Sequence, residues 1–334
     1  NIYRQKCENY VRRQGTAQFG QGGLAHDLIN AVRQFGLVPE DVYPGRKDPL
    51  KPYNHNSIEK KLKGICDDMV AKGKKGELPI DWLRQVDEAL DAEFGALPGK
   101  FTVAGKVYTA NLYRDFLGIN PDDYVTLTSF THHPMWQPFV LEIPDNFSNG
   151  LMYNVPIDDL LAGLNYALQQ GYTACWDADV SNTGFSAQNG LAIVPAKDWD
   201  AKSTTERDNT FKFHEAQKQV TQEYRQELFD RQETTDDHLM QITGVKSEGK
   251  QADIYYTVKN SWGEISDLKG YLNASEQYLR LNTISFLFNK KALPLDLRQR
   301  LGLAPGELRI PTPTPGTTPK SKAKVLPIKS APGQ

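Results

Sequence analysis

This sequence has few cysteines, no long apolar run and no excess of either charge. Its three cysteines, Cys7, Cys66 and Cys175, cannot all pair and lie far apart along 334 residues, which argues against a disulfide scaffold and a structural zinc site. No apolar run approaches the length that spans a bilayer. The 39 basic and 41 acidic residues nearly cancel, so we expect neither a membrane nor a nucleic acid among the partners.

What remains is the composition of an ordinary globular protein. Hydrophobic residues make up 39% of the chain and charged residues 24%, a balance that differs from that of disordered sequences. At roughly 150 residues per domain, the length corresponds to two domains or to one elaborated domain. The chain starts at Asn1, without a methionine, inside a segment of helical character, and we expect that sequence is missing upstream.

The spacing of apolar residues changes along the chain. A helical period predicts helices at 1–14, 24–35, 57–73 and 79–94. Further on, an alternating period predicts a hairpin at 101–108 and strands at 124–130, 139–143, 151–155, 172–180, 239–245, 254–260 and 270–273. Helices are expected between these strands at 157–170 and 211–230. Helices first and mostly strands afterwards predict an α+β fold with two lobes rather than a doubly wound sheet.

The strongest chemical motif is a histidine and an asparagine on neighbouring strands. Asn260 opens the run Asn260-Ser261-Trp262-Gly263 at the end of one predicted strand, and His238 begins the preceding strand. If the two strands are antiparallel, the start of one lies beside the end of the other. An Asn amide oxygen that accepts one imidazole N–H orients the ring, so that the other ring nitrogen can serve a nucleophile. Trp262 would cover this pair; the competing interpretation is a surface His and an Asn turn.

These motifs resemble the second half of papain-like cysteine peptidases. The segment Gln21-Gly22-Gly23, ahead of the helix at 24–35, resembles the glycine-rich substrate loop of the same family. The long stretch 50–120, together with 156–160 and 176–180, is similar to the branch that contains bleomycin hydrolase and bacterial aminopeptidase C. The resemblance extends over residues 1 to about 303.

The resemblance implies a cysteine-type peptidase that hydrolyses peptide bonds through a thioester, with no metal or organic cofactor. His238 matches the catalytic His of the family and Asn260 its orienting Asn. Gly22 and Gly23 match the loop whose backbone pairs with the peptide substrate. The family also implies a homo-oligomer, a hexamer, and a cytoplasmic location, although a periplasmic or secreted location stays open.

The implied architecture is a papain-like fold with two lobes. Residues 1–120 form a helical lobe, incomplete at its N-terminus and with a helical insertion at 50–120. Residues 121–303 form an antiparallel, barrel-like β lobe that carries the catalytic His and Asn. Residues 304–334, rich in proline and lysine, are expected to be a disordered tail. Because the family places its C-terminus in the cleft, this tail leaves both aminopeptidase and endopeptidase action open.

None of the three cysteines suits the role of the nucleophile, which needs a helix N-terminus and an imidazolium. Cys7 falls in the middle of a predicted helix, and Cys66 falls on an apolar stripe. Cys175 precedes Trp176 as in the family, but it falls in a strand, and Asp177 nearby raises a thiol pKa. We therefore expect the catalytic Cys upstream of residue 1. The alternatives are a non-catalytic, papain-like protein that binds peptides, or a plain α+β domain.

Two further groups of polar residues suggest chemistry less strongly. His132 and His133 look like a metal-binding pair, but adjacent residues on a strand point to opposite faces and no third ligand is nearby in sequence. We therefore expect a turn there and no metal. Asp177 and Asp179 could attract the α-amino group of a substrate, but we expect them to be solvated acids at a strand end.

Overall fold

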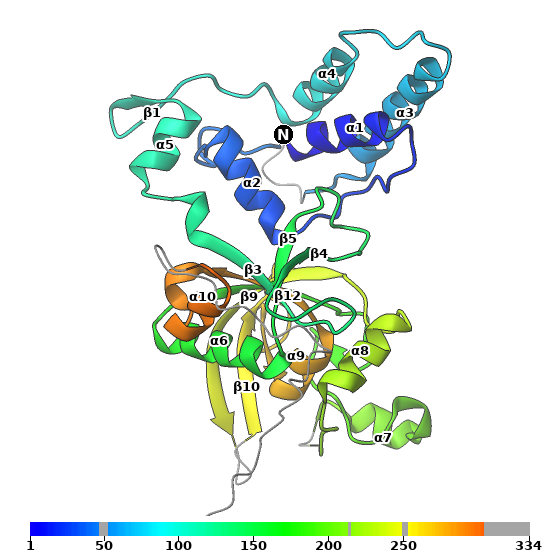
Figure 1. Ribbon diagram of the computed structural model, residues 1–334, viewed down its shortest axis with the longest axis vertical. Helices are drawn as coiled ribbons and strands as arrows, with labels where there is room; N and C mark the ends of the chain where they lie inside the picture. Colours follow the sequence, from blue (N-terminus) through cyan, green and yellow to red (C-terminus); the bar gives the residue numbers. More distant parts are fainter. Residues whose placement is uncertain (47–52, 213–214, 249–252, 304–334) are drawn as a thin grey trace, which may run out of the picture.

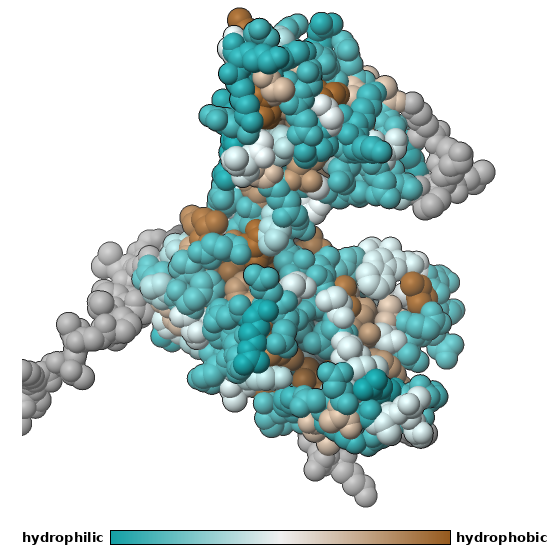
Figure 2. All heavy atoms as spheres, turned by 90° about the vertical axis from the view of Figure 1, so that its right-hand side faces the viewer, coloured by the Kyte–Doolittle hydropathy of each residue, from teal (hydrophilic) through white to brown (hydrophobic). Residues whose placement is uncertain are grey.

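The computed structural model describes residues 1–46, 53–212, 215–248 and 253–303. The tail predicted at 304–334 lies outside these described residues. Figure 1 shows a helical part at the top, made by the first third of the chain, and a larger part below it that is built on a sheet. In Figure 2 the two parts are joined by a narrow waist, with an open notch between them.

The helical part contains four helices: α1 (Ile2–Arg12), α2 (Ala25–Phe35), α3 (Asn56–Gly73) and α4 (Leu83–Phe94). Each matches a helix that the apolar spacing predicts. Helices α1, α3 and α4 enclose a small core that includes Cys7, Tyr10, Leu62, Cys66, Met69 and Val86. The apolar spacing that predicts the helices at 24–35 and 79–94 includes Leu28 and Ile80, but Leu28 is 58% exposed and Ile80 is fully exposed. Within the described residues, no helix is both long and apolar enough to cross a membrane.

A short connecting region leads from the helices to the sheet. The predicted hairpin is confirmed as β1 (Phe101–Val103) and β2 (Lys106–Tyr108), and it is followed by α5 (Ala110–Phe116) and the 3-10 turn η1 (Pro121–Asp123). Thr109 caps α5 by accepting a hydrogen bond from the Leu112 N–H. The large sheet begins directly after η1.

The sheet has ten strands in the order β4-β5-β3-β12-β6-β9-β10-β11-β8-β7. Their bounds are β3 (Tyr124–Thr128), β4 (Pro138–Val140), β5 (Leu151–Asn154), β6 (Ala174–Ala178), β7 (Phe185–Ser186), β8 (Leu191–Ala192), β9 (His238–Glu248), β10 (Asp253–Lys259), β11 (Tyr271–Ser275) and β12 (Thr283–Asn289). The pairs β3–β5 and β8–β11 are parallel, while the other pairs are antiparallel. The α+β class is therefore confirmed, but the sheet is mixed rather than wholly antiparallel.

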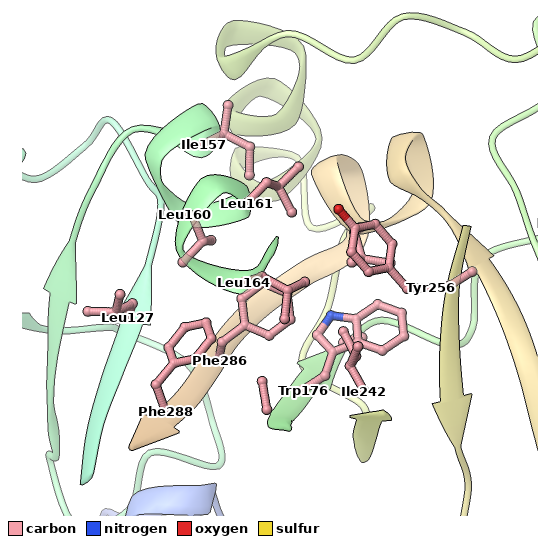
Figure 3. Packing of buried hydrophobic residues seen from close by; sticks show 14 of the residues in the cluster. Leu127, Ile157, Leu160, Leu161, Leu164, Trp176, Ile242, Tyr256, Phe286 and Phe288 are labelled. Atoms are coloured by element: carbon pink, nitrogen blue, oxygen red, sulfur yellow. The ribbon is translucent and has the colours of Figure 1, made fainter. Parts of the chain in front are cut away.

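Helix α6 (Ile157–Gln169) covers the sheet and builds the main core. Figure 3 shows its apolar face, with Leu160 and Leu164, turned toward Trp176 and Phe286 of the sheet. All four of these side chains are fully buried. The remaining helices are α7 (Thr204–Asn209), α8 (Gln222–Asp230), α9 (Glu276–Asn282) and α10 (Leu295–Arg300), with 3-10 turns η2 (Trp199–Ala201) and η3 (Lys290–Ala292).

Two elements differ from the sequence prediction. The helix expected at 211–230 is only α8, which starts after Thr221 because the Thr221 hydroxyl accepts a hydrogen bond from the Tyr224 N–H. Strand β12 had no predicted counterpart. Five of its seven residues are buried, so its apolar residues follow no alternation that would mark a strand.

The loop between β4 and β5 connects the sheet to the helices. The Asn9 amide of α1 donates to the Phe147 carbonyl at 3.0 Å, and the Lys6 ammonium lies 4.8 Å from the centre of the Phe147 ring. On α2, the His26 Nε2 atom lies 3.2 Å from the Ser148 hydroxyl. This loop therefore holds the N-terminal helices in place over the sheet.

A fully buried arginine ties α8 to the sheet. The Arg225 side chain is fully buried, its guanidinium lies 4.5 Å from the centre of the Phe130 ring, and within the described residues it donates only to backbone carbonyls. These carbonyls belong to Ser129, Arg280, Leu281 and Thr283. The planar fork of donors bonds to four carbonyls at once, which a single ammonium could not do.

We predict that Arg225→Lys lowers the free energy of unfolding by about 3 kcal/mol, because an ammonium cannot reach all four carbonyls and the charge stays buried. Urea unfolding followed by circular dichroism measures this change. The matched control is Arg231→Lys at the C-terminal end of the same helix, where the side chain is 60% exposed, and we expect a change within about 0.5 kcal/mol. Equal effects of the two substitutions would contradict the structural role of Arg225.

Candidate active site

The structure brings His238 and Asn260 together. His238 is the first residue of β9, and Asn260 directly follows β10, which pairs with β9 in antiparallel register. The His238 Nε2 atom lies 2.8 Å from the Asn260 Oδ1 atom. Since an amide oxygen only accepts, Nε2 carries the proton, and Nδ1 keeps a lone pair that can take a proton from a nucleophile. The predicted proximity of the two residues is confirmed.

The Asn260 side chain is itself held in position. Its Oδ1 atom also accepts the Ser261 N–H at 2.7 Å, and the Asn260 N–H donates to the Gly270 carbonyl at 3.0 Å. The amide oxygen is therefore kept toward His238 by a backbone donor as well as by the imidazole.

Trp262 covers the histidine ring on one face. The ring centres of Trp262 and His238 lie 4.7 Å apart with an interplanar angle of 29°. Trp262 is 45% exposed, so it stands between solvent and the imidazole. Phe185 meets the far side of the indole edge-on, with ring centres 6.1 Å apart. The stacking keeps the imidazole plane at a constant angle.

Carboxylates anchor the segment that leads into His238. Asp237 accepts the backbone N–H groups of Val180 and Ser181 at 3.1 and 3.0 Å. Asp179 accepts the Thr235 N–H at 3.1 Å. These bonds join the residues just after β6 to the segment just before His238.

Asp177 and Asp179 are not the solvated acids that the sequence predicted, because they are 1% and 0% exposed. Both are covered by neighbouring strands of the sheet, which a strand-end position in the sequence does not reveal. Burial raises the pKa of Asp177 well above its usual range, and a hydrogen bond joins its carboxyl to that of Asp236. Burial, with a further contribution from the Asp145 charge, raises the pKa of Asp236 to about 6. This pair therefore holds a proton near neutral pH.

Gly22 and Gly23 lie in the loop before α2, on the helical part. The Lys6 ammonium donates to the carbonyls of Gly20 and Gly22, which holds the loop in an extended path. A Cβ on Gly22 would overlap the carboxylate of Asp145, whereas a Cβ on Gly23 would make only ordinary contacts. A side chain at Gly22 would therefore have to displace the Asp145 carboxylate.

The three cysteines all lie in the described part of the chain, and none is a reactive thiol beside His238. Cys7 and Cys66 are fully buried in the helical core, where their thiols share a hydrogen bond that raises the pKa of Cys7. Their contact was not expected from their distance in sequence. In the sheet, Cys175 on β6 lies opposite Gln241 on β9, whereas the residue opposite His238 is Ala178. Burial, together with Asp177, raises the pKa of Cys175 to about 12.

The turn predicted at His132 and His133 is confirmed, and their ring centres lie 4.7 Å apart. The expectation that no third ligand lies nearby was wrong. A third group is also present, because the two Nε2 atoms lie 3.4 and 2.8 Å from the Glu142 carboxylate. These are the ligand types of a divalent metal site.

The hydrogen bonds around His132 nevertheless oppose metal binding. The Gln226 Oε1 atom accepts the Thr131 N–H at 2.6 Å, and its Nε2 atom donates to Asp230 and lies 3.0 Å from the His132 Nδ1 atom. Gln226 therefore donates to Nδ1, which leaves the His132 proton on Nε2, the atom that faces Glu142. A metal ion needs that nitrogen unprotonated.

Comparison with known proteins gives a family and a fold. The sequence model of the Peptidase C1-like family matches residues 82–313, a range that includes His238 and Asn260 but not the glycine loop. Aminopeptidase W of Lactobacillus delbrueckii subsp. lactis is 24% identical over 313 residues, which cover 86% of this chain and 67% of that protein. Bleomycin hydrolase of Gallus gallus is 24% identical over 306 residues, which cover 83% of this chain and 64% of that protein.

Aminopeptidase C of Lactococcus lactis subsp. lactis (strain IL1403) is 21% identical over 294 residues, covering 82% of this chain and 64% of that protein. The chain thus spans about two thirds of the length of these relatives. Among solved structures, PepW of Lactobacillus rhamnosis HN001 superposes with a TM-score of 0.64 at 18% identity, covering 90% of this chain and 73% of that one. The fold of the described chain is therefore similar to that of PepW.

The contact between Gly22 and Asp145 leads to a stability prediction. Gly22→Ala should lower the free energy of unfolding by about 1–3 kcal/mol, because the new methyl group displaces the carboxylate. The control is Gly64→Ala in α3, where a Cβ meets nothing within 4 Å, and it should raise stability by up to about 1 kcal/mol. Chemical denaturation of both variants measures the difference. Equal shifts would show that Asp145 leaves room for a side chain at Gly22.

Proposed function

This chain belongs to the Peptidase C1-like family, and we propose that it is part of a cysteine-type peptidase of the aminopeptidase C and bleomycin hydrolase kind. The observation that carries the proposal is the 2.8 Å hydrogen bond between His238 and Asn260. It leaves the His238 Nδ1 atom as a base that lacks a nucleophile within the described chain. We propose that a cysteine in a segment preceding residue 1 supplies that nucleophile.

The proposed reaction is acyl transfer through a thioester. The thiol gives its proton to the His238 Nδ1 atom, and the thiolate sulfur attacks the peptide carbonyl carbon. The resulting imidazolium then protonates the leaving amine as the C–N bond breaks. Water, deprotonated by the same Nδ1 atom, attacks the thioester and releases the thiol and the acid product. Asn260 keeps the proton on Nε2 throughout, so that His238 does not change tautomer.

The glycine loop supplies a place for the peptide backbone in this proposal. At Gly23 a Cβ would meet its neighbours only at ordinary contact distance. The residue lies just before α2, in a segment that has no helix or strand. Backbone groups that are free of secondary structure can pair with an extended peptide. The arrangement supports peptides as the substrates.

The second candidate function is peptide binding without hydrolysis. The observation that favours it is the absence of a suitably placed thiol among the three cysteines, all of which are described: Cys7 and Cys66 are fully buried, and the pKa of Cys175 is raised to about 12 by burial. The two functions differ in whether they require a nucleophile. A peptidase requires a cysteine ahead of residue 1 at a helix N-terminus, whereas a binding protein does not.

In the polypeptide that includes the preceding segment, His238→Ala should lower kcat for a peptide substrate by about 10⁴-fold or more, with little change in stability. Asn260→Ala should cause a smaller loss, because the base remains but its tautomer is no longer held. The control is His55→Ala in the helical part, where the His55 ring packs against the rings of Tyr3 and Phe94. An unchanged rate in His238→Ala would refute the role of His238.

A further inference from the structure

Two carboxyl groups contact each other close to His238 in the sequence. Asp177 lies on β6, and Asp236 lies in the segment between α8 and β9, two positions before His238. A hydrogen bond joins the two carboxyls, and Asp177 is 1% exposed. A hydrogen bond between two carboxyls needs a proton, because an ionised carboxylate only accepts. The contact therefore exists only while the pair holds at least one proton.

The surroundings of the pair do not replace this proton. The Asp177 Oδ1 and Asp236 Oδ2 atoms are buried and have no hydrogen-bond partner within the described residues. The Ser285 hydroxyl on β12 meets the Asp177 Oδ2 atom only at 3.4 Å. Asp145, on the loop between β4 and β5, and Asp237 add further negative charge. Without its last proton the pair would hold two like charges in contact, and these would repel each other.

A metal ion fits the pair less well than a proton. Within the described residues, no third ligand atom of a His, Cys, Asp or Glu lies within 4.8 Å of both carboxyls. The Cys175 thiol, on the same strand as Asp177, keeps its proton because burial raises its pKa to about 12. Two carboxyls are too few protein ligands for a buried divalent cation.

The carboxyl pair is one of three attachments between β6 with its following residues and the segment that precedes His238. In the other two, the carboxylates of Asp179 and Asp237 accept backbone N–H groups. Those bonds use an ionised acid and a backbone donor, so they persist as the pH rises. Of the three attachments, the one between Asp177 and Asp236 is the one that depends on a proton.

We propose that Asp177 and Asp236 share a proton that positions His238, and that the loss of this proton as the pH rises releases the imidazole from its stacking on Trp262. The two acids act through the segment that joins them to the histidine, so they are positioning residues. The consequence for catalysis rests on the proposed function.

The direction of the pH dependence follows from burial. Burial holds the pKa of Asp236 at about 6 and that of Asp177 well above its usual range, so the first proton leaves the pair near pH 6 and the second leaves at higher pH. The folded chain thus keeps a proton that the unfolded chain has already released. The contact therefore contributes stability at low pH and loses it as the pH rises through the second step.

The test follows the carbon-bound ring protons of His238 by NMR in this chain, with their signals identified by their absence in His238→Ala. The indole of Trp262, whose ring centre lies 4.7 Å from that of the imidazole, shifts these signals upfield. In the unmodified chain we expect this shift at neutral pH and its progressive loss as the pH is raised. In Asp236→Ala the shift should be lost already at neutral pH.

Asp236→Asn separates the shared proton from the contact itself. The amide can donate to an ionised Asp177 or accept from a protonated one, so the upfield shift of the His238 signals should persist as the pH is raised. Asp208→Asn, at an exposed acid in α7, is the matched control and should respond to pH as the unmodified chain does.

Three results would overturn the inference. They are an upfield shift that the unmodified chain keeps until it unfolds at high pH, a loss of the shift with pH that remains in Asp236→Asn, and a shift that changes on addition of EDTA, which would indicate a bound metal instead of a proton. The first and third do not depend on the folding of any variant.

Failure of the proposed peptidase activity is a separate outcome. In the polypeptide with its preceding segment, kcat for a peptide substrate should fall over the pH range in which the His238 signals move, and Asp236→Asn should remove that fall. If this polypeptide cleaves no peptide while the His238 signals behave as expected, the hydrolytic function fails and the positioning role of the carboxyl pair stands.

Discussion

The hydrogen bond between His238 and Asn260 depends on the register of two antiparallel strands, and the rest of the site is arranged around that register. Strands β9 and β10 pair over most of their length, with an irregularity between Thr257 and Val258 that shifts the partners by one residue. The buried side chains of Ile242, Tyr256 and Val258 lock these strands into the main core. Because a slip of one residue would turn the side chains to the other face of the sheet, the core determines where the imidazole and the amide meet.

The segment that precedes His238 is also held in place by hydrogen bonds. Asp237 accepts a backbone N–H just after β6 and Asp179 accepts one just before β9, and Trp262 stacks on the ring. Such an arrangement limits the motion of a base without blocking its free nitrogen. On the opposite side, the loop between β4 and β5 binds α1 and α2 through Phe147 and Ser148, and it carries Asp145 to the glycine loop. The same loop thus connects the two parts.

Sequence patterns predicted the features that depend on neighbours in the chain or on one pair of strands. The four N-terminal helices, the hairpin and most strands followed from apolar spacing, and the proximity of His238 and Asn260 followed from two adjacent strands. Contacts between distant segments were missed. Asp145 and Gly22 are far apart in sequence, as are Cys7 and Cys66, and no periodicity links them. The third group beside His132 and His133 was missed because Glu142 lies nine to ten residues away in the chain, and Asp177 was wrongly placed because burial at a strand end depends on which strands lie beside it.

The central claim is that His238 and Asn260 serve a cysteine thiolate, and the most direct measurement is the rate of alkylation by iodoacetamide as a function of pH. It is made on the polypeptide with its preceding segment, in the unmodified form and as His238→Ala. The account predicts one thiol that already reacts as a thiolate at about pH 5–6 and that returns to an ordinary pKa of about 8.5 when His238 is removed. If no thiol reacts below about pH 7, or if His238→Ala leaves the profile unchanged, the pair does not activate a nucleophile and the account is contradicted.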